Sequence, residues 1–136
     1  YSINRINTGL SILLKRGERI MISKGIRGAI TIDENSPEAI GGGTIKLLKE
    51  MMSKNKIETD MISHVIFTLT NDLNADFPAK YARVNLKWKD VPMMCFHELD
   101  VPNALAKCLR VLIVVNCGDT FVPEFVYLDG AEVLRK

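Results

Sequence analysis

The sequence predicts a single α+β domain, built on a mixed five-stranded sheet with two main helices. About five apolar segments are short and rich in alternating or β-branched residues, whereas two segments begin at a proline and have helical spacing. A chain of 136 residues, with 47% hydrophobic and 25% charged residues, suits one globular domain. Two helices can cover only one face of such a sheet, so we expect identical subunits to cover the other.

The first predicted strand spans residues 21–33, MISKGIRGAITID. Strand side chains alternate between faces, so its isoleucines share one face and Arg27 lies on the other among small residues. Nearby glycines leave space for another group to approach the backbone. Arg27 is therefore a candidate anion-binding residue, with an ordinary exposed strand arginine as the alternative.

The first predicted helix begins at Ser36, a favourable N-cap, with Pro37 at the first helical position, and extends to about Ser53. Three consecutive glycines, residues 41–43, interrupt its apolar face at a cost of about 1 kcal/mol each relative to alanine. We therefore expect the first turn to be weak or frayed. The glycines lack the lysine of a P-loop, which argues against a phosphate site.

A second strand is predicted over residues 63–71, and a second helix begins at Pro78. Lys80 and Arg83 are three residues apart and share one face of this helix. Cations in the first turn oppose the helix dipole, and such local rules are often broken at functional sites. Both residues are therefore candidates for a site.

Three further strands complete the predicted sheet. One lies within residues 91–100, starts after Pro92 and ends in an acidic pair. Another spans residues 109–116, where β-branched residues favour strand over helix. A last strand or pair of strands within residues 125–135 carries Tyr127 and Arg135.

Arg110 stands before five consecutive aliphatic residues in CLRVLIVVN, residues 108–116, a run that looks fully buried. A guanidinium keeps its charge, so its burial without an anion is strongly unfavourable. No acidic residue lies within eight positions of Arg110 in the sequence. We therefore expect its counterion to be a ligand, with an internal pair to Glu98 or Asp100 as the alternative.

Composition argues against several classes of function. The net charge of +2 is spread along the chain without a dense basic block, which disfavours nucleic acid as a partner. The longest apolar run is far too short to span a membrane. Three cysteines without CxxC spacing and two distant histidines indicate reduced thiols, a cytoplasmic protein and no metal site.

The first twenty residues have an unusual pattern. The stretch KRGERI directly before Met21 back-translates to a purine-rich segment, as a ribosome-binding site read as protein would. We expect Met21 to be the native start, residues 1–20 to be a translated leader or a segment added for expression, and residues 21–136 to form the domain.

The candidate site residues are mainly cationic. Planar guanidinium groups bind carboxylates through two prongs, so several of them together imply a small ligand with more than one negative group. Tyr127 adds a neutral donor, and Glu98 is the one carboxylate expected inside a strand. The structural alternatives are a packing role for Tyr127, a solvated strand-end acid for Glu98 and a core position for Cys95. The residues alone thus predict an anion-binding α+β domain.

Five stretches taken in order, GIRGAIT, DLNADFPAKYAR, VPMMCFHELDV, KCLRVLIVVN and VYLDGAEVLR, resemble the chorismate mutases of the AroH class. The resemblance is collinear over residues 21–135. It implies a homotrimer with a central pseudo-barrel of strands and with active sites between neighbouring subunits. It also implies an isomerase that converts chorismate to prephenate in phenylalanine and tyrosine biosynthesis, without cofactor, metal or covalent intermediate. Chorismate is a dicarboxylate, which suits the cationic residues.

The resemblance also implies individual roles. Arg110 would stabilise the negative charge that develops on the ether oxygen whose bond breaks. Arg27 and Tyr127 would bind the enolpyruvyl carboxylate, and Glu98 with the neighbourhood of Cys95 would hold the ring hydroxyl. A larger set would bind the ring carboxylate or form the pocket walls: Lys80, Arg83, Arg135, Phe77, Ala79, Met93, Met94 and Leu134.

The alternative function is a trimeric small-carboxylate-binding regulator or imine deaminase of similar architecture. A regulator or deaminase of this kind needs one arginine for one carboxylate. The four cations of this chain, Arg27, Arg110, Lys80 and Arg83, suit two carboxylates and a developing charge.

The sequence departs from the family pattern at two places. Met94 replaces a smaller polar residue, which implies a bulkier wall, and the glycine triplet stands where relatives carry helix formers.

Overall fold

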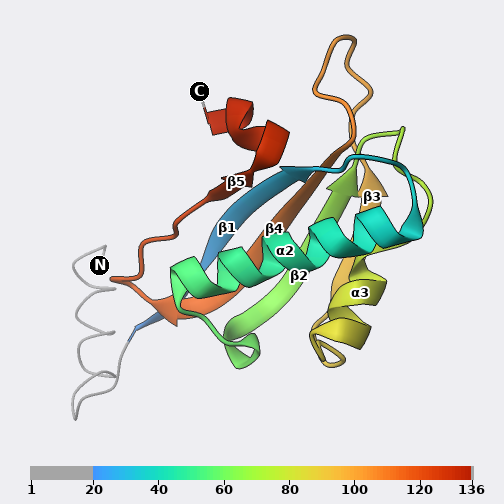
Figure 1. Ribbon diagram of the computed structural model, residues 1–136. Coiled ribbons are helices and arrows are strands. Elements are labelled where there is room, and N and C mark those ends of the chain that lie inside the picture. Colours follow the sequence, from blue (N-terminus) through green and yellow to red (C-terminus); the bar gives the residue numbers. More distant parts are fainter. Residues whose placement is uncertain (1–19, 136) are drawn as a thin grey trace.

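The computed structural model describes residues 20–135 as one five-stranded mixed sheet with its two α-helices on one side (Figure 1). The strand order is β3-β2-β4-β1-β5, with antiparallel pairing at the centre and a parallel pair at each edge. The strands are β1 (Met21–Thr31), β2 (Ile62–Leu69), β3 (Met93–His97), β4 (Cys108–Gly118) and β5 (Val126–Leu128). The predicted α+β class and number of strands are confirmed. The expected leader, residues 1–20, lies almost wholly outside the described residues.

Two α-helices, α2 (Pro37–Asn55) and α3 (Pro78–Asn85), lie on the same face of the sheet (Figure 1). The core lies between them and the strands, where Phe67, Leu47 and Ile113 are fully buried. Two short 3-10 helices, η1 (Thr59–Met61) and η2 (Asp129–Arg135), complete the described fold. Within residues 20–135, no helix is both long and apolar enough to cross a bilayer.

The central strands β1 and β4 pair over eleven residues each, with Ala29 opposite Arg110. Alternation along β4 buries Leu109, Val111 and Ile113 against the helices and turns the intervening side chains to the other face. The run that contains Arg110 is therefore buried on one side only. The expectation of a fully buried run is wrong, because β4 lies in a sheet that is covered on one face.

Helix α2 is continuous through its three glycines, so the expected fraying of its start is not observed. Ser36 caps the helix as predicted, with its Oγ accepting from the Ala39 N–H at 3.1 Å. A Cβ on Gly41 would lie 2.5 Å from the Tyr81 ring of α3, and one on Gly43 would collide with the Ile32 side chain. Two of the glycines thus allow close packing, which offsets their low helix propensity.

The C-terminal segment differs from the prediction. Strand β5 has only three residues, and the chain then turns into η2, so Arg135 lies in a 3-10 helix and not in a strand. The turn is held by the Gly130 N–H, which donates to Thr31 Oγ1 at 2.8 Å. Ala131 and Leu134 of η2 pack beside Ala29 at the end of the sheet.

The sheet face opposite the helices carries exposed apolar side chains. Phe96 is 47% exposed and Met94 is 61% exposed, and their strand partners Thr68 and Ile66 point to the same face. We call this surface, formed by β1–β5 on the side away from α2 and α3, the open face. Neither α2 nor α3 covers it, and η2 packs against only one end of it, at Ala29 and Cys108.

Candidate active site

Pairing between strands places four polar or small residues in one row across the open face. Tyr127 of β5 lies opposite Ala29 of β1, Ala29 opposite Arg110 of β4, and Arg110 opposite Thr68 of β2. Arg27 lies two residues before Ala29 on the same strand and face, so its side chain is a diagonal neighbour of Arg110. The register of the sheet therefore determines the layout of this site.

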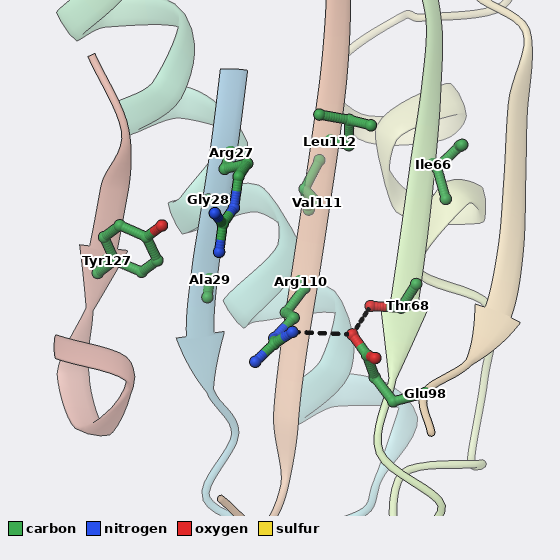
Figure 2. A pocket seen from close by; sticks show the side chains of 10 residues that line it. All are labelled: Arg27, Gly28, Ala29, Ile66, Thr68, Glu98, Arg110, Val111, Leu112 and Tyr127. Atoms are coloured by element: carbon green, nitrogen blue, oxygen red, sulfur yellow. Dashed lines mark hydrogen bonds and ion pairs between the residues drawn. The ribbon is translucent and has the colours of Figure 1, made fainter. Parts of the chain in front are cut away.

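These residues line a pocket of about 260 Å³ (Figure 2). The polar side chains come from Arg27, Thr68, Glu98, Arg110 and Tyr127, and Ile66 and Leu112 supply an apolar wall. All five polar side chains point into the same space in Figure 2. Four residues predicted from the sequence, on four different segments, are thus brought together.

Arg110 has a carboxylate partner within its own chain. Its Nη1 lies 3.5 Å from Glu98 Oε2, and its side chain is 45% exposed. The expectation that only a ligand would serve as counterion is therefore wrong, and the alternative of an internal pair with Glu98 is confirmed. The pair is loose, since it uses one guanidinium nitrogen at a distance beyond normal hydrogen-bond length.

Glu98 follows β3 directly and is not inside the strand, which corrects its predicted position. Its N–H donates to the Leu69 carbonyl at 2.9 Å, so its backbone is held against β2. Its Oε2 also accepts a hydrogen bond from Thr68 Oγ1. Within residues 20–135, both contacts of this carboxylate use the same oxygen, and Oε1 makes none.

Sequence reasoning missed Thr68 and Phe125. Thr68 holds Glu98, and its position directly opposite Arg110 becomes evident only once the register of β2 and β4 is known. The ring of Phe125 lies 5.9 Å from the Arg27 guanidinium carbon, within the range of a cation–π contact. Phe125, two positions before Tyr127, belongs to no sequence pattern that indicates a binding site.

The cations of α3 are not part of this cluster. Lys80 and Arg83 lie on a helix packed beside β3, at the sheet edge farthest from β5 (Figure 1). Lys80 Nζ pairs with Asp76 Oδ2 at 3.0 Å, and Phe77 at the start of the helix is 68% exposed. Ala79, in the first turn of α3, is buried in the core between the helix and the sheet.

The β3 residues divide between the two faces. Cys95 and Met93 point toward the helices and pack against the core, whereas Met94 points to the open face. Cys95 shares a second surface pocket with Phe77, away from the cluster around Arg110. Burial raises the pKa of the Cys95 thiol, although a hydrogen bond with the Ala79 backbone opposes this shift. A neutral, packed thiol suits the structural interpretation of Cys95.

The two η2 candidates do not line the pocket, although Leu134 packs in one cluster with two residues that do, Ala29 and Tyr127. Leu134 packs with Ala29 and Cys108 in a small second core, and Arg135 is exposed. Thus the structure unites Arg27, Glu98, Arg110 and Tyr127, places Leu134 beside them, and leaves the remaining predicted site residues elsewhere on the same chain.

The pocket carries two guanidinium groups and one carboxylate, so it is net positive and suited to an anion. Arg27 and Arg110 can both donate through planar forks, which match carboxylate geometry. Between residues 20 and 135, no three His, Cys, Asp or Glu side chains cluster in a way that could hold a metal ion. The chemistry available to this arrangement is binding, orientation and stabilisation of negative charge.

Comparison with known proteins agrees with this geometry. The family model described as chorismate mutase type I matches residues 23–136. The curated chorismate mutase AroH of Thermus thermophilus is 43% identical over 117 residues, covering 82% of this chain and 93% of the relative. That of Bacillus subtilis is 37% identical over 119 residues, covering 85% and 91%. A solved chorismate mutase from Clostridium thermocellum superposes with a TM-score of 0.77 at 48% identity, covering 81% of this chain and 98% of that one.

These matches span nearly the whole described domain, and they decide between the enzyme and the binding regulator or deaminase considered as alternatives. The protein is an isomerase acting in aromatic amino acid biosynthesis. The chain belongs to the type I chorismate mutases.

Proposed function

We propose that the pocket on the open face is half of the active site and that a neighbouring subunit of a homotrimer supplies the other half. The reaction is the rearrangement of chorismate, a dicarboxylate, to prephenate. The observation that supports this proposal is the separation of the cations, with Arg27 and Arg110 on the open face and Lys80 and Arg83 on α3. One subunit cannot present both sets to one small substrate.

The exposed apolar surface supports assembly. Met94, Phe96 and the partly exposed Ile66 and Leu112 lie on the face that carries the pocket. Contiguous apolar surface of this kind typically marks a protein interface. Packing of this face against a second copy would bury it and would surround the pocket with another subunit's residues.

In this mechanism Arg110 is the main catalytic group. One of its nitrogens contacts Glu98 at 3.5 Å, while a guanidinium has five N–H donors, so others remain for substrate. They would donate to the ether oxygen as its bond to carbon breaks and negative charge develops there. Because the donor is already in place, little reorganisation is required during the reaction.

The other residues of the pocket would hold chorismate in its reactive folded shape. Arg27 and Tyr127 lie on adjacent strands and would bind the enolpyruvyl carboxylate together. Glu98 would use Oε1 to accept from the ring hydroxyl, while Thr68 and Arg110 hold Oε2. Orientation contributes strongly to a unimolecular rearrangement, since it removes unproductive conformers.

The ring carboxylate would meet Lys80 and Arg83 of the neighbouring subunit, with Phe77 as a wall at the mouth of the cleft. Arg135 and Leu134 lie near the end of the sheet that carries Tyr127 and would close another side. Cys95 would act through its backbone and its packing, and Met94 through the subunit interface.

We also propose a cytoplasmic location. Cys95, Cys108 and Cys117 are all free thiols in the structure, which suits a reducing compartment.

Subunit complementation tests the shared site. An Arg110→Ala chain lacks the open-face half, and a Lys80→Ala/Arg83→Ala chain lacks the α3 half. Co-expression of the two in equal amounts should restore about a quarter of wild-type activity in mixed trimers, because about a quarter of random clefts then combine two intact halves. A site contained in one subunit predicts no recovery, and that result would overturn the shared cleft.

A further inference from the structure

The start of α3 carries a hydrogen-bond network that the mechanism does not use. Asp76 Oδ1 accepts from the Phe77 N–H at 2.8 Å, and Asp76 Oδ2 accepts from Lys80 Nζ at 3.0 Å and from the Tyr81 hydroxyl at 2.8 Å. One carboxylate therefore has three donors, two of which come from residues proposed to face substrate. Asp76 itself is largely covered, with its side chain 15% exposed.

The three donors differ in their freedom to move. The Phe77 N–H belongs to the backbone at the helix start, and the Tyr81 ring is packed against Gly41 so closely that a Cβ there would lie 2.5 Å from it. Lys80 has a flexible stem and a side chain that is 50% exposed. Of the three, only the Lys80 ammonium can leave without disturbing the packing between α2 and α3.

The network also keeps the Asp76 carboxylate hydrogen-bonded after the Lys80 ammonium leaves it. The hydrogen bond from Lys80 is the largest cause of the lowered pKa of Asp76, followed by those from the Phe77 N–H and the Tyr81 hydroxyl. Burial, and then the neighbouring Asp76, raise the pKa of the Tyr81 phenol, so it stays a protonated donor. After Lys80 departs, the carboxylate retains two fixed donors and remains an anion.

We propose that Asp76 is a positioning residue that holds Lys80 in a resting pair and releases it to the ring carboxylate when chorismate binds. This inference rests on the proposed role of Lys80 in the substrate site. Tyr81, seated on Gly41, supplies the hydrogen bond that makes the release possible. The resting pair competes with substrate, so it lowers affinity for a dicarboxylate.

The network also explains why one residue of the glycine triplet at positions 41–43 must be small. A larger residue at position 41 would displace the Tyr81 ring and with it the donor to Asp76. Gly42, by contrast, faces open space, since a Cβ at this position would have no other atom within 4 Å. Only the first of these two neighbouring glycines is therefore linked to the network.

A double-mutant cycle in steady-state kinetics tests the proposal. Asp76→Asn keeps the shape of the side chain and removes the competing charge, so we expect KM for chorismate to fall about two- to fivefold with kcat changed less. Lys80→Ala should raise KM about fivefold or more, because a charge-assisted contact is lost. In the Lys80→Ala background, Asp76→Asn should have no further effect on KM.

Each outcome of the cycle has a distinct meaning. If Asp76→Asn lowers KM equally with and without Lys80, Asp76 acts by direct repulsion of substrate and the resting pair is overturned. The resting pair is also overturned if Asp76→Asn leaves KM unchanged while Lys80→Ala raises it. If Lys80→Ala leaves KM unchanged, the proposed role of Lys80 fails, and this inference fails with it.

A second measurement uses the wild-type protein and does not depend on a variant that folds. Carboxyl carbon NMR at a constant neutral pH should compare the resonance of the Asp76 carboxylate with and without saturating prephenate. We expect this resonance to move when the product draws Lys80 away, because the carboxylate then loses one of its three donors. An unchanged resonance with prephenate bound would contradict the release of Lys80.

Discussion

The two faces of the sheet use the same alternating strands for different purposes. Toward the helices, β2 and β4 present Phe67, Val111 and Ile113, which are buried in a dry core. On the open face the same strands present Thr68, Arg110 and Leu112, which line a pocket with charged groups. One face provides rigidity and the other chemistry, and a shift of one residue in register would exchange them.

The largest expected effect is a loss of stability from the covered face. Phe67 is fully buried, so Phe67→Ala should lower the free energy of unfolding by about 3–5 kcal/mol. The matched control is Phe96→Ala on the open face, where the ring is 47% exposed. Denaturant titration with sedimentation should show that Phe96→Ala mainly weakens self-association. If both variants lost the same free energy of unfolding, the helix-covered face would contribute no more to stability than the open face.

The next effect concerns catalysis on the open face. Arg110→Ala removes a preorganised donor, so kcat should fall about 10²- to 10³-fold, which corresponds to about 2.7–4 kcal/mol of transition-state stabilisation. Circular dichroism and the thermal midpoint should change little, since the side chain is 45% exposed. Full activity in this variant would remove Arg110 from the mechanism.

A smaller effect separates two glycines of α2. Gly41→Ala places a methyl group against Tyr81, so overpacking of about 1–3 kcal/mol opposes the gain in helix propensity of about 1 kcal/mol. Gly42→Ala meets no atom within 4 Å and should stabilise the protein by up to about 1 kcal/mol. Thermal unfolding should therefore place the two midpoints on opposite sides of wild type. Two equal upward shifts would argue against close packing at Gly41.

The smallest effect is expected at Cys95. Its thiol is packed toward the core, and burial raises its pKa, so no thiolate is available for chemistry at neutral pH. Cys95→Ser should retain kcat/KM within about tenfold of wild type, since no nucleophile is required. Complete inactivation of a folded variant would reopen covalent catalysis.

Much of the fold was predictable because its signals are local. Alternation located β1 and β2, β-branched residues located β4, and Ser36 with Pro37 marked the start of α2. The short β5 and the helix η2 were not separated, because three strand residues carry little periodic signal. The structural importance of Gly41 was also hidden, since its reason lies forty residues later in Tyr81.

The candidate site was predictable in its residue types and less so in its contacts. Arg27, which has small residues around it, and Arg110, which precedes an aliphatic run, indicated an anion site. The pocket contains both. The Arg110–Glu98 pair forms because the chain after β3 is held against the end of β2. The sequence alone does not show that Glu98 reaches this position. The distance between Arg110 and the α3 cations depends on strand order, so it became evident only from the sheet topology.

The most direct test is a crystal structure of the protein with a dicarboxylate mimic of the transition state. We expect an Arg110 nitrogen to lie about 2.7–3.1 Å from the oxygen of the mimic that corresponds to the ether oxygen. Arg27 and Tyr127 should hold one carboxylate, and α3 of a neighbouring subunit should hold the other. A mimic bound away from the pocket, with Arg110 still engaged only by Glu98, would contradict the electrostatic role assigned to the open face.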